Sequence, residues 1–347
     1  MSRVIFFDST LRDGSHAIKH QLTKQNIEDY CKIIDETGVY CVLVGHGNGL
    51  GASSLQVGLS KLSDEEMISV ARKNLQRTKL GVFLIPGFGT IENNIKPAIK
   101  MGVDIFCVAS HCSEADVTKQ HIEYLKNENK EVYGILMMYH MVSKEKILEE
   151  AQKMQSYGAK GIILMDSAGA STPEMVEKTI SLLVNNLEIK VGFHPHNNLG
   201  LAVSNAYVAL KSGASIIDGT VRAFGAGAGN CQLEALLALL EKEKMKTGVD
   251  LFKVLDASEN VVKNMVEVDK GITSLSIVSG MAGVFSSFIP HVVRAAERFE
   301  VDPKEILIEL GQRKVVGGQE DVIIEIAQKL KDRKKVDSYI YRIETLS

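Results

Sequence analysis

The 347-residue sequence contains no tryptophan and only six prolines. It has no run of about 18 apolar residues, as a membrane span would need, and the apolar stretch near its start is cut off by Asp8, which argues against a secretory signal. The 40 Lys and Arg residues nearly balance the 43 Asp and Glu residues, so no phosphate backbone or anionic membrane is expected as a partner. We expect a cytoplasmic protein with a small-molecule partner, and neither nucleic acid nor membrane.

The cysteines are few and odd in number, and their spacing fits no common metal motif. We therefore expect reduced thiols packed in the core rather than disulfides or a zinc site. The five are Cys31, Cys41, Cys107, Cys112 and Cys231.

Short β-branched runs alternate with amphipathic stretches over roughly the first 245 residues, a pattern that indicates a parallel sheet. Eight units in series, without a sign of reversed strand order, favour a closed (β/α)₈ TIM barrel over an open doubly wound sheet. The expected strands are 3–8, 41–45, 80–86, 104–110, 132–139, 161–167, 190–196 and 215–220. Expected helices include 23–37, 62–76, 114–126, 143–157, 172–185 and 199–212.

Strand patterns nearly vanish after residue 248, where helical patterns cover 251–266, 285–299, 303–310 and 321–331. We expect a catalytic barrel over residues 1–248 and a small all-helical C-terminal domain over residues 249–347. Pro303 suits the first turn of a helix, with Asp302 as its N-cap. Residues 338–347 are expected to pair as a short strand or to hang free.

Polar side chains gather where the expected strands end, which is where a barrel of this kind carries its catalytic groups. His194 and His196 are two positions apart on one strand and can therefore face one metal ion. A hydrogen-bonded histidine pair is the structural alternative. Asp13, after the first strand, is the candidate third ligand, and two imidazoles with one carboxylate suit Mn²⁺, Mg²⁺, Co²⁺ or Zn²⁺.

A family resemblance rests on seven segments that follow one another in the chain. They closely resemble the metal-dependent 4-hydroxy-2-oxovalerate aldolases, which belong to the wider, HMG-CoA-lyase-like group of DxTLRDG barrel lyases and acyl-condensing synthases. The segments are DSTLRDGSHAIKHQ, SHCSEADVTKQHIEY, LMMYHM, DSAGA, HPHNN, GAGAGN and GGQED. The similarity extends over nearly the whole chain.

The resemblance implies a carbon–carbon lyase with a divalent metal, usually Mn²⁺, bound by Asp13, His194 and His196. It would cleave 4-hydroxy-2-oxopentanoate, or a related 4-hydroxy-2-oxo acid, to pyruvate and acetaldehyde or a related aldehyde, via a metal-bound pyruvate enolate. Arg12 would stabilise the enolate, and His16 would take the proton from the C4 hydroxyl. The implied substrate-binding residues are Arg12, Asp13, Ser167, His194 and Phe285.

Each of these roles has an alternative. Arg12 could instead pair structurally with Asp8 or Asp166, and His20 could be the base in place of His16. Ser167 could merely cap the next helix, and Asn230 could be a further ligand or orient a second-shell water.

The sequence departs from the family pattern in three motifs. GYAGVYSSF appears as SGMAGVFSSF, with Met281 and Phe285 where the family has tyrosines. HGDG appears as HGNG, and HxHHN as HPHNN. Loss of the phenol at Phe285 predicts a change in aldehyde preference, stereochemical control or channel gating.

The resemblance also implies a partner, an acylating acetaldehyde dehydrogenase that receives the aldehyde through a channel. The C-terminal extension would dock this partner and contribute to contacts between copies of the chain. Two other functions compete: a Claisen-type synthase that condenses an acyl-CoA with a 2-oxo acid, and a non-catalytic docking subunit. The second of these predicts a damaged metal triad.

Overall fold

The computed structural model describes residues 4–266 and 271–344, and for residues 334–344 it describes the backbone only. Eight parallel strands close into a barrel in sequence order, β1 to β8. Their bounds are β1 Ile5–Leu11, β2 Cys41–Val44, β3 Lys79–Leu84, β4 Ile105–His111, β5 Glu131–Met137, β6 Gly161–Asp166, β7 Lys190–Pro195 and β8 Ile216–Gly219. The predicted TIM barrel is confirmed.

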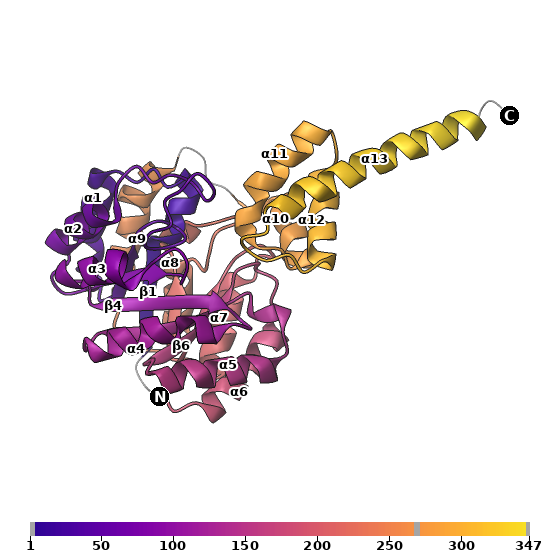
Figure 1. The fold of residues 1–347 in the computed structure, drawn as a ribbon. Coiled ribbons are helices and arrows are strands. Elements are labelled where there is room, and N and C mark those ends of the chain that lie inside the picture. Colours follow the sequence, from indigo (N-terminus) through magenta and orange to yellow (C-terminus); the bar gives the residue numbers. More distant parts are fainter. Residues whose placement is uncertain (1–3, 267–270, 345–347) are drawn as a thin grey trace.

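Helices surround the barrel on the outside (Figure 1). They are α1 Lys24–Ile34, α2 Asp64–Asn74, α3 Lys96–Lys100, α4 Lys119–Asn127, α5 Lys144–Tyr157, α6 Pro173–Asn186, α7 Ala202–Lys211, α8 Leu233–Lys242 and α9 Leu251–Asn260. Local sequence sets their ends: Ser63 caps α2 in a reciprocal pair with Glu66, and Gly158 ends α5 with φ 111°. α3 and α8 are not among the helices expected above.

Two apolar layers hold the barrel together. One lies between the strands and the outer helices, and the other fills the barrel interior with side chains such as Phe7, Leu43 and Ile163. The barrel is thus a packed core rather than a pore. All five cysteines are buried free thiols, as predicted.

Four further helices follow the barrel: α10 Ser274–Ala282, α11 Ile289–Phe299, α12 Pro303–Gln312 and α13 Asp321–Glu344. Asp302 caps α12 as predicted. These helices bury an apolar cluster of their own, which includes Val292, Ile306 and Ile326. α9, by contrast, buries Val254 and Ala257 in the barrel's outer layer.

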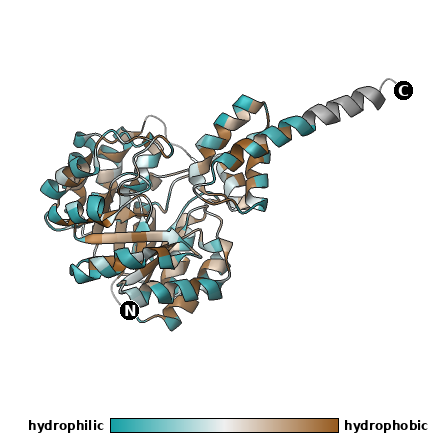
Figure 2. Cartoon of the chain, in the orientation of Figure 1, coloured by the Kyte–Doolittle hydropathy of each residue, from teal (hydrophilic) through white to brown (hydrophobic). Residues whose placement is uncertain are grey.

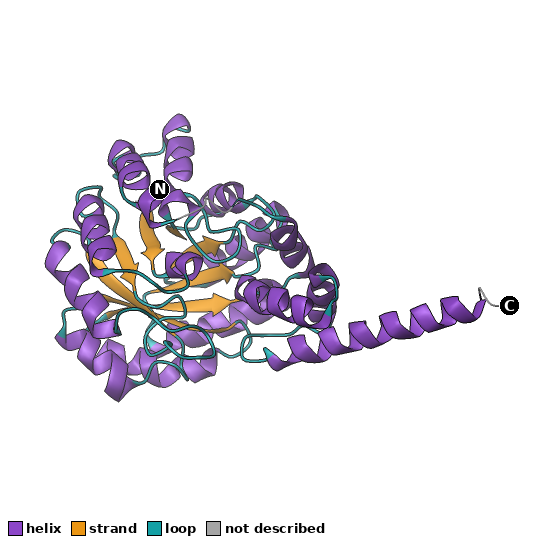
Figure 3. Cartoon of the chain, turned by 90° about the horizontal axis from the view of Figure 1, so that it is seen from above, coloured by secondary structure: helices purple, strands orange, loops and turns teal. Residues whose placement is uncertain are grey.

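The C-terminal helices lie toward the carboxyl ends of the strands, as the arrowheads in Figure 3 show. α13 extends well beyond the rest of the molecule (Figure 1). Figure 2 shows apolar colour on the strands and more polar colour on the outer helices. Within the described parts of the chain, no helix is long and apolar enough to cross a membrane.

Two expectations are wrong in detail. α13 continues to Glu344, so residues 338–344 form a helix instead of a short strand or a free end, while residues 345–347 lie outside the described residues. β1 continues to Leu11 beyond its expected end at Asp8, with an irregular register between Asp8 and Leu11. Ser9 and Thr10 therefore belong to the barrel wall.

Candidate metal and substrate site

Asp13, His194 and His196 converge at the carboxyl end of the barrel. Asp13 begins the short helix η1 (Asp13–Ile18) directly after β1, His194 lies in β7, and His196 is one residue past the end of β7. All three are buried, and one potential ligand atom from each lies within 4.8 Å of the others. The arrangement brings together two imidazoles and one carboxylate from strands that are far apart in sequence.

The orientation of His194 is fixed by Asp218 in β8. His194 Nδ1 donates a hydrogen bond to Asp218 Oδ2 at 2.7 Å, and Ser9 Oγ donates to Asp218 Oδ1 at 2.7 Å. This leaves Nε2 as the free nitrogen of His194, and that buried atom has no hydrogen-bond partner among the described residues. A histidine held by a carboxylate, with its other nitrogen bare, fits a metal ligand.

Asp13 is held in its ionised form. Burial opposes ionisation, but the positive charge of the Arg12 guanidinium outweighs it and holds the pKa of Asp13 well below its usual range. Asn230 Nδ2 and the Ala226 amide donate to Asp13 Oδ1 at 2.9 and 3.1 Å. Asn230 thus orients the candidate ligand. Burial also lowers the pKa of His196, to about 3, so its imidazole is neutral and able to bind a metal.

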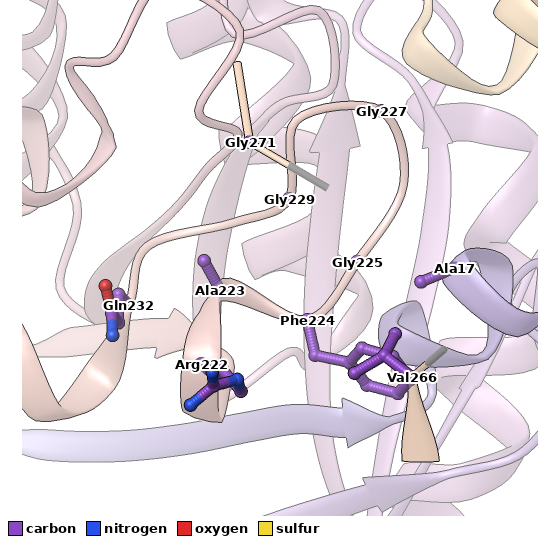
Figure 4. A pocket seen from close by; sticks show the side chains of 10 residues that line it. All are labelled: Ala17, Arg222, Ala223, Phe224, Gly225, Gly227, Gly229, Gln232, Val266 and Gly271. Atoms are coloured by element: carbon purple, nitrogen blue, oxygen red, sulfur yellow. The ribbon is translucent and has the colours of Figure 1, made fainter. Parts of the chain in front are cut away.

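The glycine-rich loop after β8 brings backbone close to Asp13. A Cβ at Gly225 would lie 2.8 Å from Asp13 Oδ1 and 2.3 Å from Asn230 Nδ2, so only glycine fits there. The same loop lines a cavity of about 270 Å³, which Figure 4 shows with Phe224 lying near Ala17 and Val266. The GAGAGN motif therefore supports the site both through its backbone and through the side chain of Asn230.

Arg12 lies beside Asp13. Its Nη1 donates to Asp13 Oδ2 at 2.7 Å and to the Gly47 carbonyl at 3.2 Å, and Nη2 donates to Ser9 Oγ at 3.2 Å. The guanidinium carbon lies 4.7 Å from the centre of the Phe83 ring, in a cation–π contact. The carboxylates that Arg12 pairs with are Asp13, at 2.7 Å, and Asp218, at 4.0 Å, so the alternative pairing with Asp8 or Asp166 is wrong.

Three histidines, His16, His20 and His46, form a cluster next to Gly47. The rings of His20 and His46 stack with centres 3.7 Å apart, and His16 meets His20 edge-on at 4.9 Å. Both nitrogens of His46 are engaged, because Nδ1 accepts from the Asn48 amide at 3.0 Å and Nε2 donates to the Gly58 carbonyl at 3.1 Å.

His20 is also tied to its surroundings. Its Nδ1 lies 3.3 Å from Ser15 Oγ and 3.4 Å from the Gly47 amide, and its ring bonds the Val57 backbone. Burial lowers the pKa of His20 to about 3, and it also lowers the pKa of His16. The ring of His20 is thus engaged in structural contacts, which favours His16 over His20 as the base.

Ser167 directly follows β6, and its Oγ lies 3.4 Å from the Met138 amide. Thr172, and not Ser167, caps the following helix α6, so the capping alternative is wrong. The Ser167 carbonyl accepts a hydrogen bond from the Ser286 amide at 3.3 Å. This contact brings the neighbouring Phe285, which packs on Phe288 with ring centres 5.9 Å apart, to the end of β6.

The sequence analysis did not predict that Asp218, Ser9 and Phe83 contact the candidate site residues His194 and Arg12. It expected polar residues only at strand ends, whereas Asp218 lies within β8 and is fully buried. A lone carboxylate in the apolar run SIIDG was the available signal, because a buried charge needs a partner.

Comparisons with known proteins agree with these features. The HMGL-like family model matches residues 3–261, and the DmpG-like communication domain matches residues 270–332. A 4-hydroxy-2-oxovalerate aldolase of Pectobacterium atrosepticum is 51% identical over 333 residues, covering 96% of this chain and 97% of that protein. The aldolase of the same name from Spirochaeta aurantia is 49% identical over 330 residues, covering 95% and 97%.

Two solved structures share the fold at low sequence identity. The carboxyl transferase domain of Rhizobium etli pyruvate carboxylase has a TM-score of 0.80 at 15% identity and covers 96% of this chain and 61% of that chain. HMG-CoA lyase of Bacillus subtilis has a TM-score of 0.66 at 20% identity and covers 80% of this chain and 97% of that chain.

Proposed function

Because the chain belongs to the HMGL-like family and, within it, to the 4-hydroxy-2-oxovalerate aldolases, we propose that Asp13, His194 and His196 hold its divalent metal while Arg12 and His16 serve the reaction. The enzyme is a carbon–carbon lyase that cleaves 4-hydroxy-2-oxovalerate to pyruvate and acetaldehyde. The systematic name of this substrate is 4-hydroxy-2-oxopentanoate. The observation that carries the residue assignment is the buried Nε2 of His194, which has no hydrogen-bond partner in the described part of the chain and lies close to the ionised Asp13.

A divalent ion at this site supplies positive charge that polarises the 2-oxo group of the substrate. The donor set of two imidazole nitrogens and a carboxylate suits several first-row ions, and we propose Mn²⁺, with Mg²⁺, Co²⁺ and Zn²⁺ as competitors. The test strips the protein with a chelator and titrates each ion by calorimetry. Stoichiometric binding that His196→Ala abolishes supports the site, and binding equal to wild type in that variant rules it out.

In the proposed reaction, His16 accepts the proton of the C4 hydroxyl. The O–H electrons form the aldehyde carbonyl, the C3–C4 bond breaks, and its electron pair moves into an enolate of pyruvate. The enolate takes up one proton at C3 and leaves as pyruvate, while His16 releases the one proton that it accepted and becomes neutral again. Arg12 provides fixed positive charge where the enolate oxygen becomes negative, and Ser167 and Phe285 contact the substrate.

The choice of base can be tested directly. His16→Ala is expected to lower kcat by about 10² or more, because general-base catalysis is lost, with metal content unchanged. His20→Ala is the matched variant and should lower kcat less. Pyruvate release is followed with lactate dehydrogenase. An unchanged kcat in His16→Ala would assign the role to His20 or a water.

We further propose that an acylating acetaldehyde dehydrogenase docks on the C-terminal extension and that the extension also carries contacts between copies of the chain. The match of residues 270–332 to a communication domain supports a dehydrogenase partner. The proposed division is a catalytic barrel, residues 1–248, and a docking extension, residues 249–347, with α9 remaining packed on the barrel. Co-purification of full-length protein and of a chain ending at residue 266 with the dehydrogenase tests the docking role.

The two competing functions lack support. Curated relatives of nearly full coverage are aldolases rather than condensing synthases, and the metal triad that a docking subunit would lose is intact.

A further inference from the structure

Asn198 joins the strand that carries the proposed metal ligands to the C-terminal helices. It lies two residues after His196 and is fully buried. Its Nδ2 donates to the Ser276 carbonyl at 3.3 Å, and its Oδ1 accepts from Ser286 Oγ at 3.0 Å. Ser276 lies in the first turn of α10, and Ser286 follows the end of α10. One side chain thus holds the first turn of this helix and the segment that follows the helix.

Two more hydrogen bonds fasten the same segment to neighbouring strands. The Ser286 amide donates to the Ser167 carbonyl at the end of β6, at 3.3 Å. His140, just past β5, lies with Nε2 3.2 Å from the carbonyl of Gly283, the residue that ends α10. The contact surface is close-fitting, because a Cβ at Gly280 would lie 3.0 Å from Asn198 Cβ.

Both polar groups of the Asn198 amide therefore bond to the part of the chain that contains helices α10 to α13, which we call the C-terminal unit. A buried amide that loses such partners is left unsatisfied, which costs more than the bond itself contributes. α10 cannot shift on the barrel without breaking at least one of these buried bonds.

We propose that Asn198 is a positioning residue that latches the C-terminal unit onto the end of β7 and holds the Phe285 segment over the mouth of the barrel. This inference rests on the proposed function of that site. The preceding Asn197 has a different task, because its Oδ1 accepts from the Ala202 amide at 3.2 Å and so supports the start of α7 within the barrel. The adjacent asparagine thus provides a matched control.

The experiment measures hydrogen exchange of the α10 amides by mass spectrometry in full-length, Mn²⁺-loaded protein. Asn198→Ala should speed the exchange of residues 276–286 by about tenfold, because local opening of α10 no longer breaks the latch. Asn197→Ala should leave this exchange at the wild-type rate. Ser286→Ala removes one of the two bonds and should give a smaller increase.

The double variant tests whether the two side chains act through one bond. Asn198→Ala with Ser286→Ala should exchange no faster than Asn198→Ala alone, because the shared bond is already lost. In the kinetics, KM for the 4-hydroxy-2-oxo acid should rise severalfold in Asn198→Ala while Mn²⁺ stoichiometry stays at the wild-type value, as a displaced Phe285 segment predicts.

Two results would overturn the latch. One is exchange of α10 in Asn198→Ala that equals that of Asn197→Ala. The other is a wild-type exchange rate of α10 in Ser286→Ala. This variant deletes a single hydroxyl, and it decides the question if Asn198→Ala does not fold. Failure of the proposed aldolase chemistry would show instead as absent pyruvate release by wild-type protein, whatever the exchange rates are.

Discussion

Asp218 acts on the proposed metal site through His194. The carboxylate accepts a hydrogen bond from His194 Nδ1 at 2.7 Å and so keeps Nε2 free to bind metal. Asp218→Asn removes the negative charge and weakens control of the tautomer, so Mn²⁺ affinity should fall about 10–100-fold. Calorimetric titration measures the affinity. Asp104→Asn, in the surface pair with Arg72, is the control, and equal Mn²⁺ affinities in both variants would contradict the role of Asp218.

Gly47 shapes the place of the proposed base. A Cβ at Gly47 would lie 2.3 Å from His16 Nε2, while the Gly47 carbonyl accepts a hydrogen bond from Arg12. Gly47→Ala must therefore displace His16, and a shift of about 1 Å at a reacting group can cost about 10² in rate. We expect a fall of that order in kcat with unchanged metal content.

The control for Gly47→Ala is Gly317→Ala. An added Cβ at Gly317 would meet no other atom of the described chain within 4 Å, so kcat should stay at the wild-type value. Full activity of Gly47→Ala would show that His16 can move without loss.

At the scale of elements, Glu150 in α5 holds the start of the short helix η3 (Ala115–Thr118) that precedes α4. The side chain is buried, its Oε2 accepts from the Ala115 amide at 2.7 Å, and Lys146 and Lys153 lie 2.8 Å from Oε1. Glu150→Ala leaves a buried amide unpaired and should lower the free energy of unfolding by about 2–4 kcal/mol.

Glu149→Ala provides the comparison, because Glu149 pairs with the same two lysines but is half exposed. Such a surface pair contributes about 0–1 kcal/mol. Urea unfolding measures both variants. If Glu150→Ala and Glu149→Ala lowered the free energy of unfolding equally, the lysines, and not the Ala115 amide, would account for the role of Glu150.

The Ala115 contact also shows what a family motif can and cannot reveal. The segment HCSEADVTKQHIEY distinguishes the aldolases, yet in the structure its Ala115 and His121 make structural contacts, the latter with the Gly89 carbonyl at 3.0 Å. The resemblance to the family implied roles for Arg12 and His16 as well as for the metal triad, through other motifs than this one. The strand-end pattern by itself pointed only to Asp13, His194 and His196 as candidate ligands, which the fold brings together.

Element ends were predictable only where a local signal exists. Gly158 caps the end of α5, which the sequence placed at residue 157, and Asp302 caps the start of α12 as the sequence predicts. The end of β1 at Leu11 depends on an irregular register with β2, which no local pattern encodes. The strand-like run SYIYRI near the C-terminus lies in α13 up to Glu344, since no glycine or proline stops that helix once it has started.

At the scale of the whole molecule, the barrel and the C-terminal unit have separate apolar cores, and hydrogen bonds join the two parts. The described hydrogen bonds between them involve Asn198, Ser167 and His140 near the site and the exposed Gln56 farther out. Units joined by polar contacts are expected to move relative to one another more readily than units that share a core. This is the arrangement that a docking extension needs if a partner is to influence the barrel.

The pH dependence of whole-molecule stability offers a further test through Asp8, a buried carboxyl in β1. Burial raises the pKa of Asp8 to about 6, against an ordinary value of 3.8, although Thr10 and Tyr30 donate hydrogen bonds to it. The folded protein therefore holds this proton more tightly than the unfolded chain. The contribution of Asp8 to the free energy of unfolding is fully present below a pH of about 4, and it is lost as the pH rises through about 6.

Asp8→Asn carries no charge at any pH and should remove this component. The free energy of unfolding of wild type minus that of Asp8→Asn should fall by about 3 kcal/mol between pH of about 4 and pH of about 8. Urea unfolding at several pH values measures it, with Asp256→Asn on the exposed face of α9 as the control. A difference between wild type and Asp8→Asn that stays constant with pH would mean that Asp8 ionises in the folded protein as it does in the unfolded chain.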